Sequence, residues 1–294
     1  NTAALAKKCG LGEEVGIAFY RRLSTIDDIW GDFHRIAKDP TYSSGHTLKV
    51  VLPFYRAMGA TSQWLYDFAK DSLRVVPGIS EVLNVLGRKY NVWQISTSYE
   101  FFVRAFCDSV GFEFGRTRCT LVEKFDEISI AEEERVQLLA FMKEIAAMSV
   151  IEYDEKTGEV VPEHQSHYKR FTSFIWETVY SMPVGELLRT VHPVGQTQKR
   201  EAMEEICQEF KVPKRKVMYV GDSQTDVQVV EWLQGEGLTM MFNGKGRVCS
   251  MSDIMYIGED TAVIDSVANL FAARGRQGVI DFYMSPKTPN SGEI

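Results

Sequence analysis

The sequence lacks any apolar run long enough to span a bilayer, and no signal peptide is visible in it. Its five cysteines are odd in number and form no Cys-x-x-Cys pair, so neither a disulfide framework nor a zinc knuckle is predicted. A surplus of basic charge is also lacking, because 33 Lys and Arg stand against 40 Asp and Glu. A general nucleic-acid surface needs clustered cations. These absences predict a cytoplasmic protein with no membrane span and no nucleic-acid partner.

What is present is the composition of an ordinary globular protein. The chain has 294 residues, of which 45% are hydrophobic and 25% charged, enough to bury a substantial core. This length predicts one large domain, or a core with an inserted cap, rather than a string of modules. The net charge of −7 leaves a small anionic substrate open, since a local pocket can be positive on an acidic protein. No pattern indicates an oligomeric state.

The most informative stretch is a strand followed by a glycine turn that carries two aspartates. Residues 217–220 are all apolar and predict a strand buried on both faces, Gly221 ends it, and residues 227–233 predict a helix. Asp222 and Asp226 therefore follow the carboxyl end of a strand, the usual ligand position in an open α/β sheet. Two hard oxygen ligands at this point suit Mg²⁺. The alternative interpretation is a capped helix start with a solvated acid in its first turn.

Two further positions favour the ligand-binding interpretation. Residues 92–96 predict a second strand, which ends in the hydroxyl residues Ser96, Thr97 and Ser98. Ser96 is favoured as an anion-binding hydroxyl because it stands at the strand end, and Thr97 is the alternative. Ser98 is expected to cap the helix that follows. Lys199 opens another predicted helix between the two strands.

A strand-end serine, a helix-start lysine and a Gly-Asp-x-x-x-Asp turn, in this order, resemble motifs two, three and four of the haloacid dehalogenase (HAD) superfamily. The resemblance covers residues 71–119 and 191–270, and it extends to archaeal HAD-like proteins with a large second insertion. It implies an α/β fold with a HAD-like Rossmannoid parallel sheet and helices on both faces. The alternation of predicted strands and helices agrees with a parallel sheet.

The domain organisation follows from where the pattern changes. Residues 1–70 predict only helices and are interpreted as a helical cap. Residues 71–119 and 191–282 are the two parts of the core. Residues 120–190 are too long for a simple connection and predict an α+β cap insertion. Residues 283–294 predict a weakly ordered tail.

Local patterns define the elements within these regions. In the first cap, the spacing predicts helices at residues 15–23 and 26–36 and a loop at 39–45. In the insertion, Ser129-Ile-Ala-Glu132 has the pattern of a capping box that opens a helix. A β-hairpin around residues 150–162 and a helix at 167–180 are expected to follow.

The resemblance also implies an activity and a role for each motif residue. Such proteins are Mg²⁺-dependent phosphohydrolases that act on small phosphorylated metabolites through an aspartyl-phosphate intermediate. Asp222 and Asp226 would hold the metal ion. Ser96 or Thr97 would donate to a phosphoryl oxygen, and Lys199 would offset the charge of the phosphate and the nucleophile.

The nucleophile motif of the family, Asp-x-Asp-x-Thr, does not occur in this sequence. Asp154 followed by Thr157 mimics it faintly, but Lys156 stands where the second acid belongs and a hairpin explains the pattern better. We expect the nucleophile strand directly before Asn1. If that strand is lost, the alternative is a non-catalytic HAD-like subunit or binding protein of a larger complex. A dehalogenase is a third hypothesis, disfavoured by the two acids suited to a metal ion.

The histidines offer one more candidate site. His164 and His167 stand three residues apart and could contact one metal ion. Neither a cysteine nor a further histidine lies nearby in the sequence, so a solvated surface is the favoured interpretation.

Overall fold

The computed structural model describes residues 1–37, 45–154 and 156–284 of the chain. It divides into two compact units, and each is considered by itself. The first unit comprises residues 1–74 and 93–198, and the second comprises residues 75–92 and 199–294. The chain is a mixed α/β protein with short parallel sheets. No helix of the described residues is long and apolar enough to cross a membrane.

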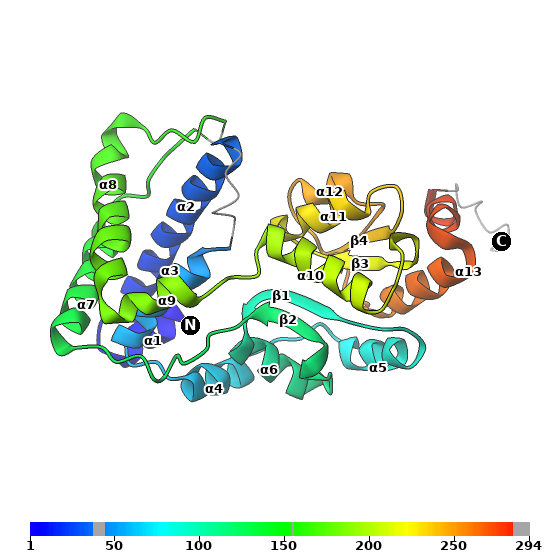
Figure 1. Ribbon diagram of the computed structural model, residues 1–294, viewed down its shortest axis with the longest axis horizontal. Helices are drawn as coiled ribbons and strands as arrows, with labels where there is room; N and C mark the ends of the chain where they lie inside the picture. Colours follow the sequence, from blue (N-terminus) through cyan, green and yellow to red (C-terminus); the bar gives the residue numbers. More distant parts are fainter. Residues whose placement is uncertain (38–44, 155, 285–294) are drawn as a thin grey trace, which may run out of the picture. The chain divides into compact units, whose positions relative to one another are not determined.

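The first unit is mainly helical (Figure 1). Its helices are α1 (Thr2–Lys8), α2 (Glu13–Ala37), α3 (Thr47–Ala57), α4 (Ser62–Ser72), α6 (Glu100–Val110), α7 (Glu132–Ala147), α8 (Gln165–Ser173) and α9 (Glu186–Thr190), with the π-helical segment η3 (Phe174–Val179) and the 3-10 turns η1 (Phe114–Arg116), η2 (Pro162–His164) and η4 (Pro183–Gly185).

Aromatic side chains form the centre of this unit. The rings of Phe141 and Phe174 stack with centroids 3.6 Å apart, and the Phe54 ring lies 6.4 Å from that of Phe141. All three side chains are buried in one continuous core. Residues 1–70 and 120–190, which the sequence suggests as two caps, therefore share one hydrophobic core. Apolar burial of this kind is the main stabilising contribution in a globular unit.

The first cap contains one long helix where two were expected. Residues 15–23 and 26–36 both belong to α2, which is continuous over 25 residues. The predicted break fails because the residues between the two segments fit a helix. Thr25 donates its hydroxyl to the carbonyl oxygen of Arg21 at 3.1 Å, a bond within the helix that does not interrupt it.

The capping box predicted at Ser129 is wrong. Helix α7 begins at Glu132, and its N-cap residue is Ala131. The amide of Ala131 donates to the carboxylate of Glu134 at 3.0 Å, so the acid of the first turn satisfies this amide. The expected helix exists, but it begins two residues later than a cap at Ser129 would allow.

The insertion contains less β structure than expected. Of the hairpin predicted around residues 150–162, the described residues form only one antiparallel bridge, between Tyr153 and Val160. The helix predicted at 167–180 begins earlier, at Gln165, and changes from α-helical in α8 to π-helical in η3.

A two-stranded parallel sheet completes the first unit. Strand β1 (Gln94–Tyr99) pairs with β2 (Thr117–Thr120), with Ser96 opposite Cys119, and α6 connects them. The strand predicted at 92–96 thus begins two residues later and includes the hydroxyl residues after Ser96.

The second unit is a three-stranded parallel sheet with helices on both faces. The strands lie in the order β3-β4-β5. On one face Tyr219 and Met241 pack with α11, and on the other Met240 and Ile254 pack with Phe271 of α13. The elements are α5 (Ile79–Lys89), α10 (Gln196–Glu209, whose first three residues belong to the first unit), η5 (Lys214–Lys216), β3 (Met218–Gly221), η6 (Gln224–Asp226), α11 (Val227–Leu233), β4 (Leu238–Phe242), α12 (Val248–Met251), β5 (Ile254–Tyr256) and α13 (Ala262–Met284).

Long-range polar contacts hold α5 in this unit. Lys89 forms an ion pair with Asp265 at 3.1 Å, and the Tyr90 hydroxyl donates to the side chain of Asn269 at the same distance. Helix α13 bends at Gly275, whose φ of 68° is left-handed and suits glycine.

Two predicted segments lie largely outside the described residues. They are the loop at 39–45 and the tail at 283–294. Of the predicted tail, Tyr283 and Met284 are described, and both are helical, as the last residues of α13.

Candidate functional site

The turn after β3 is organised around one buried carboxylate, that of Asp226, whose residue is only 1% exposed. Its Oδ1 accepts hydrogen bonds from Lys199 Nζ at 2.7 Å and from the Tyr219 hydroxyl at 2.6 Å. Its Oδ2 accepts from the backbone amides of Asp222 and Ser223, both at 2.9 Å. A carboxylate offers about four lone-pair positions, so all of those on Asp226 are used.

Gly221 makes this arrangement possible. A Cβ atom at this position would lie 2.7 Å from Oδ2 of Asp226 and 3.0 Å from Cε1 of Tyr219. Any other residue would push the Asp226 carboxylate away from the amides of Asp222 and Ser223. The glycine that ends the strand is therefore required for close approach of the aspartate to the backbone.

Burial and charge oppose each other at Asp226. Burial raises the pKa of a carboxyl group, but the Lys199 ammonium and the hydrogen bonds from Lys199, Tyr219 and the Ser223 amide outweigh it. The pKa of Asp226 therefore lies below its usual range. Burial, and then the charge of Asp226, hold the pKa of Tyr219 well above its usual range. At neutral pH the carboxylate is charged and the phenol is its hydrogen-bond donor.

The ammonium group of Lys199 has donors that Asp226 does not use. Its side chain, on α10, is 8% exposed, and among the described residues its ammonium has one acceptor, Asp226. An ammonium group has three donors, so two remain. A largely buried ammonium group with two unused N–H donors can donate them to an anion.

Asp222 differs from Asp226 in every respect that matters for metal binding. It is exposed, and its carboxylate makes no hydrogen bond or ion pair within the described residues. Asp222 therefore fits a direct ligand of Mg²⁺, which binds through one or two carboxylates. Asp226 does not fit that role, because its oxygens are occupied by four donors. Within the described part of the chain, no group of three or more His, Cys, Asp or Glu is arranged to hold a metal ion.

Ser96 and Thr97 lie in β1, in the first unit. The Oγ of Ser96 accepts the backbone amide of Ser98 at 3.2 Å. Helix α6 begins at Glu100 with Tyr99 at its N-cap position, so Ser98 does not cap it as the sequence suggests, and the Tyr99 side chain forms no capping bond. The Thr97 hydroxyl is buried and has no hydrogen-bond partner among residues 1–37, 45–154 and 156–284, which leaves one donor at the strand end unsatisfied within them.

The sequence did not single out Tyr219. It stands in the apolar run of β3, where its ring was interpreted only as part of the strand. The signal was nevertheless present, since a tyrosine in a buried strand needs a partner for its hydroxyl.

Strands β1 and β3 each have one open edge. Within the described residues, β1 pairs only with β2, and β3 pairs only with β4. The first four residues of β4, which has a neighbour on either side, are buried, whereas in β3 only Tyr219 is buried. Over residues 217–220, Val217 and Tyr219 on one face are buried, and Met218 and Val220 on the other face are partly buried, so the predicted burial on both faces is complete on one face only.

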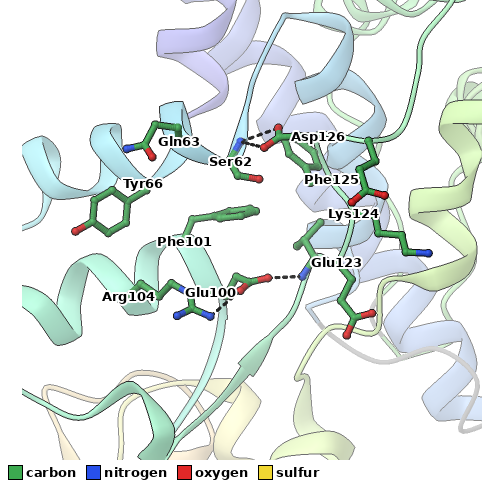
Figure 2. Close-up of a pocket in the computed structure, with 12 residues that line it drawn as sticks. Ser62, Gln63, Tyr66, Glu100, Phe101, Arg104, Glu123, Lys124, Phe125 and Asp126 are labelled. Carbon is green, nitrogen blue, oxygen red and sulfur yellow. Dashed lines mark hydrogen bonds and ion pairs between the residues drawn. The ribbon is translucent and has the colours of Figure 1, made fainter.

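A cavity of about 660 Å³ lies elsewhere in the first unit, among α4, α6 and residues 122–127 (Figure 2). Two of its carboxylates are already engaged. Glu100 accepts the amide of Val122 at 3.0 Å, and Asp126 accepts the amide of Ser62 at 2.9 Å. None of the predicted site residues lines this cavity, so its volume alone does not make it the catalytic site.

The two weaker candidates in the insertion have structural roles. Nδ1 of His164 accepts the amide of Glu152 at 3.0 Å, which ties the histidine to the chain before the turn. The carboxylate of Asp154 accepts the amide of Lys156 at 2.7 Å, as expected for a turn residue.

Comparison with known proteins gives a likeness of structure. No family model matches the chain, and no curated protein matches its sequence. Among solved structures it is similar to that of gene product AF1437 from Archaeoglobus fulgidus, with a TM-score of 0.74 and 24% sequence identity. The match covers 93% of this chain and 79% of that chain. At this identity the likeness establishes a shared fold and carries no information on activity.

Proposed function

We propose that this protein is a HAD-type, Mg²⁺-dependent phosphohydrolase that acts on a small phosphorylated metabolite. The observation that carries the proposal is the turn after β3, where the buried ammonium of Lys199, fixed by Asp226, lies in the same turn network as the exposed carboxylate of Asp222. A cation for a phosphate and a carboxylate for a metal ion at the carboxyl end of a parallel strand are what phosphoryl transfer requires.

Each residue of the turn has a separate role in this proposal. Asp222 binds Mg²⁺, which would neutralise charge on the phosphate. Lys199 donates its remaining N–H groups to a phosphoryl oxygen and offsets the charge of the phosphate and nucleophile. Asp226 is a positioning residue, because its bond to Lys199 and its bonds to two turn amides hold the lysine and the turn together. The phosphate-binding role of Ser96 or Thr97 remains a prediction from the resemblance.

A HAD-type phosphohydrolase also needs an aspartate nucleophile, and the motif that carries it in the family does not occur in this sequence. Within the described residues β3 has one open edge, so its backbone groups there are available to a further parallel strand. None of the described residues at the turn replaces that aspartate as a nucleophile. Lys199 is engaged with Asp226, and the hydroxyl of Ser223 has Thr225 as its neighbour at 2.9 Å rather than a base.

The second candidate function is that of a non-catalytic HAD-like subunit or binding protein. One observation favours it, the exposed apolar end of α13, where Phe282 is 56% and Met284 74% exposed. Exposed apolar side chains that form a contiguous patch mark contact surfaces. The two candidates differ in whether the protein turns over substrate.

Phosphate release from a panel of phosphate monoesters tests the proposal. The protein encoded by the full gene is assayed with Mg²⁺, including an aryl phosphate as a general substrate. Lys199→Ala and Asp222→Asn should each lower kcat/KM by roughly a hundredfold or more, as for loss of a group that stabilises transition-state charge. Glu231→Gln, an exposed acid on α11, serves as the control and should retain activity. An inactive wild-type protein, or equal activity in all variants, would favour the non-catalytic alternative.

A further inference from the structure

We propose that the loop joining β4 to α12, residues 243–247, binds a second phosphoryl group of the substrate. This proposal rests on the proposed function, in which the turn after β3 binds the first phosphate. The loop has the sequence Asn-Gly-Lys-Gly-Arg and follows the carboxyl end of β4, the neighbour of β3. It is called the basic loop below.

The basic loop lies directly against the turn after β3. The backbone amide of Lys245 donates to the backbone carbonyl oxygen of Asp222 at 3.0 Å. Gly246 lies near the side chain of Gln224, since a Cβ on this glycine would be 3.7 Å from Oε1 of Gln224. A ligand held at Asp222 therefore has the basic loop as its immediate neighbour in the same unit.

The backbone of the basic loop is held in place on its other side. The side-chain amide of Asn243 donates to the carbonyl oxygen of Gly258 and accepts its amide, both at 2.9 Å. A Cβ on Gly244 would lie 2.9 Å from the Cβ of Met241, so only glycine fits there. Asn243 and Gly246 have φ values of 53° and 75°, both in the left-handed region. These contacts preorganise the loop before any ligand arrives.

The donors of the basic loop are available to an anion. Within the described residues, the backbone amides of Gly244, Gly246 and Arg247 have no protein acceptor. The side chains of Lys245 and Arg247 are exposed, and neither forms an ion pair in that part of the chain. Two uncompensated cations beside three amide donors form an anion-binding arrangement on a protein whose net charge is −7.

The number of donors indicates the class of ligand. A phosphoryl group carries up to two negative charges and three acceptor oxygens, and guanidinium groups bind it in a bidentate manner. Two cations and three amides suit this group better than a carboxylate with a single charge. The substrate class that fits is therefore a small compound with two phosphoryl groups, one held at Lys199 and Asp222 and the other at the basic loop.

Calorimetric binding of two inert analogues tests this inference without catalysis. Methylenebisphosphonate and methylphosphonate are titrated into the full-length protein with Mg²⁺. The bisphosphonate should bind at least about tenfold more tightly, and the double variant Lys245→Ala, Arg247→Ala should lose this advantage while its affinity for methylphosphonate stays the same.

The matched control removes two cations from the opposite end of β3. Arg215 and Lys216 are exposed and precede the amino end of that strand. The control variant Arg215→Ala, Lys216→Ala should keep the preference of the wild-type protein for the bisphosphonate. A control variant that loses the preference as fully as the loop variant would show a general charge effect and overturn the inference.

The two proposals fail in different ways. If the wild-type protein binds both analogues equally, or fails to bind the bisphosphonate, the basic loop is not a phosphoryl site, whatever the activity on an aryl phosphate. If the preference exists and depends on Lys245 and Arg247 but no phosphate ester is hydrolysed, the subsite stands and the protein is a binding protein.

Discussion

Replacing Lys199 by methionine isolates the electrostatics of the buried turn. The substitution keeps most of the apolar volume of the side chain but removes the ammonium that lies 2.7 Å from Asp226. Removing one partner of a buried ion pair typically costs about 3–5 kcal/mol, because the other charge remains uncompensated. Tyr219 and two amides continue to donate to Asp226. We therefore expect a loss near the lower limit, about 3 kcal/mol in the free energy of unfolding at pH 7.

The pH dependence of this loss has a definite sign. In the wild-type protein the pKa of Asp226 is depressed, so its contribution to stability is present above the unfolded pKa and disappears as the pH falls through the folded pKa. Burial is the largest single cause acting on this pKa, and loss of Lys199 removes the charge and one of the hydrogen bonds that oppose it, so we expect the pKa of Asp226 to be raised in the variant. In the variant, protonation of Asp226 at lower pH therefore relieves the cost of its buried charge. The difference in stability between the two proteins should be largest at neutral pH and smaller at acid pH.

Urea denaturation of both proteins at pH 7 and at pH 5 measures this difference directly. The same difference at both pH values would show that lost packing, not charge, explains the effect. A difference below about 1 kcal/mol at pH 7, the range of an exposed ion pair, would refute the description of Lys199 and Asp226 as a buried pair.

Three further predictions concern the same turn. Gly221→Ala should destabilise the protein by about 1–3 kcal/mol in urea denaturation, because the added Cβ would lie against the Asp226 carboxylate. The control Gly87→Ala, in the middle of α5 with open space around it, should instead stabilise the protein by up to about 1 kcal/mol. Tyr219→Phe should cost about 1.5–3 kcal/mol, the contribution of a hydrogen bond to a charged group, and equal stability of the two proteins would contradict that bond. Asp222→Asn should weaken Mg²⁺ binding in calorimetry by about tenfold or more and leave the free energy of unfolding unchanged. The control Glu231→Gln should change neither quantity. Equal Mg²⁺ affinity in wild type and Asp222→Asn would show that this aspartate is not a metal ligand.

Local patterns in the sequence determined most of the secondary structure of the second unit. The strand predicted at 217–220 is shifted by one residue in the structure, and the run 238–242, which precedes Asn-Gly, forms β4. Both are short apolar runs that end at glycine or asparagine-glycine, a signal contained within a few residues. The alternation of strands and helices likewise indicated a parallel sheet, which the second unit contains.

The sequence also placed Asp222 and Asp226 together in one turn, but it did not distinguish their roles. The two residues have the same chemistry and stand four positions apart. Which one turns inward depends on groups that are remote in sequence, since Lys199 lies 27 residues before Asp226. The tertiary structure decided that Asp226 accepts four donors and that Asp222 remains exposed.

Long-range packing decided what the sequence left open in the first unit. The sequence suggested two separate caps, because residues 71–119 interrupt the helical segments. The structure places Phe54 from one segment beside Phe141 from the other, in a single core. Helical periodicity shows that a segment has an apolar face, but it does not identify the segment against which that face packs. That choice depends on complementary side chains far apart in the chain, and only the tertiary structure shows it.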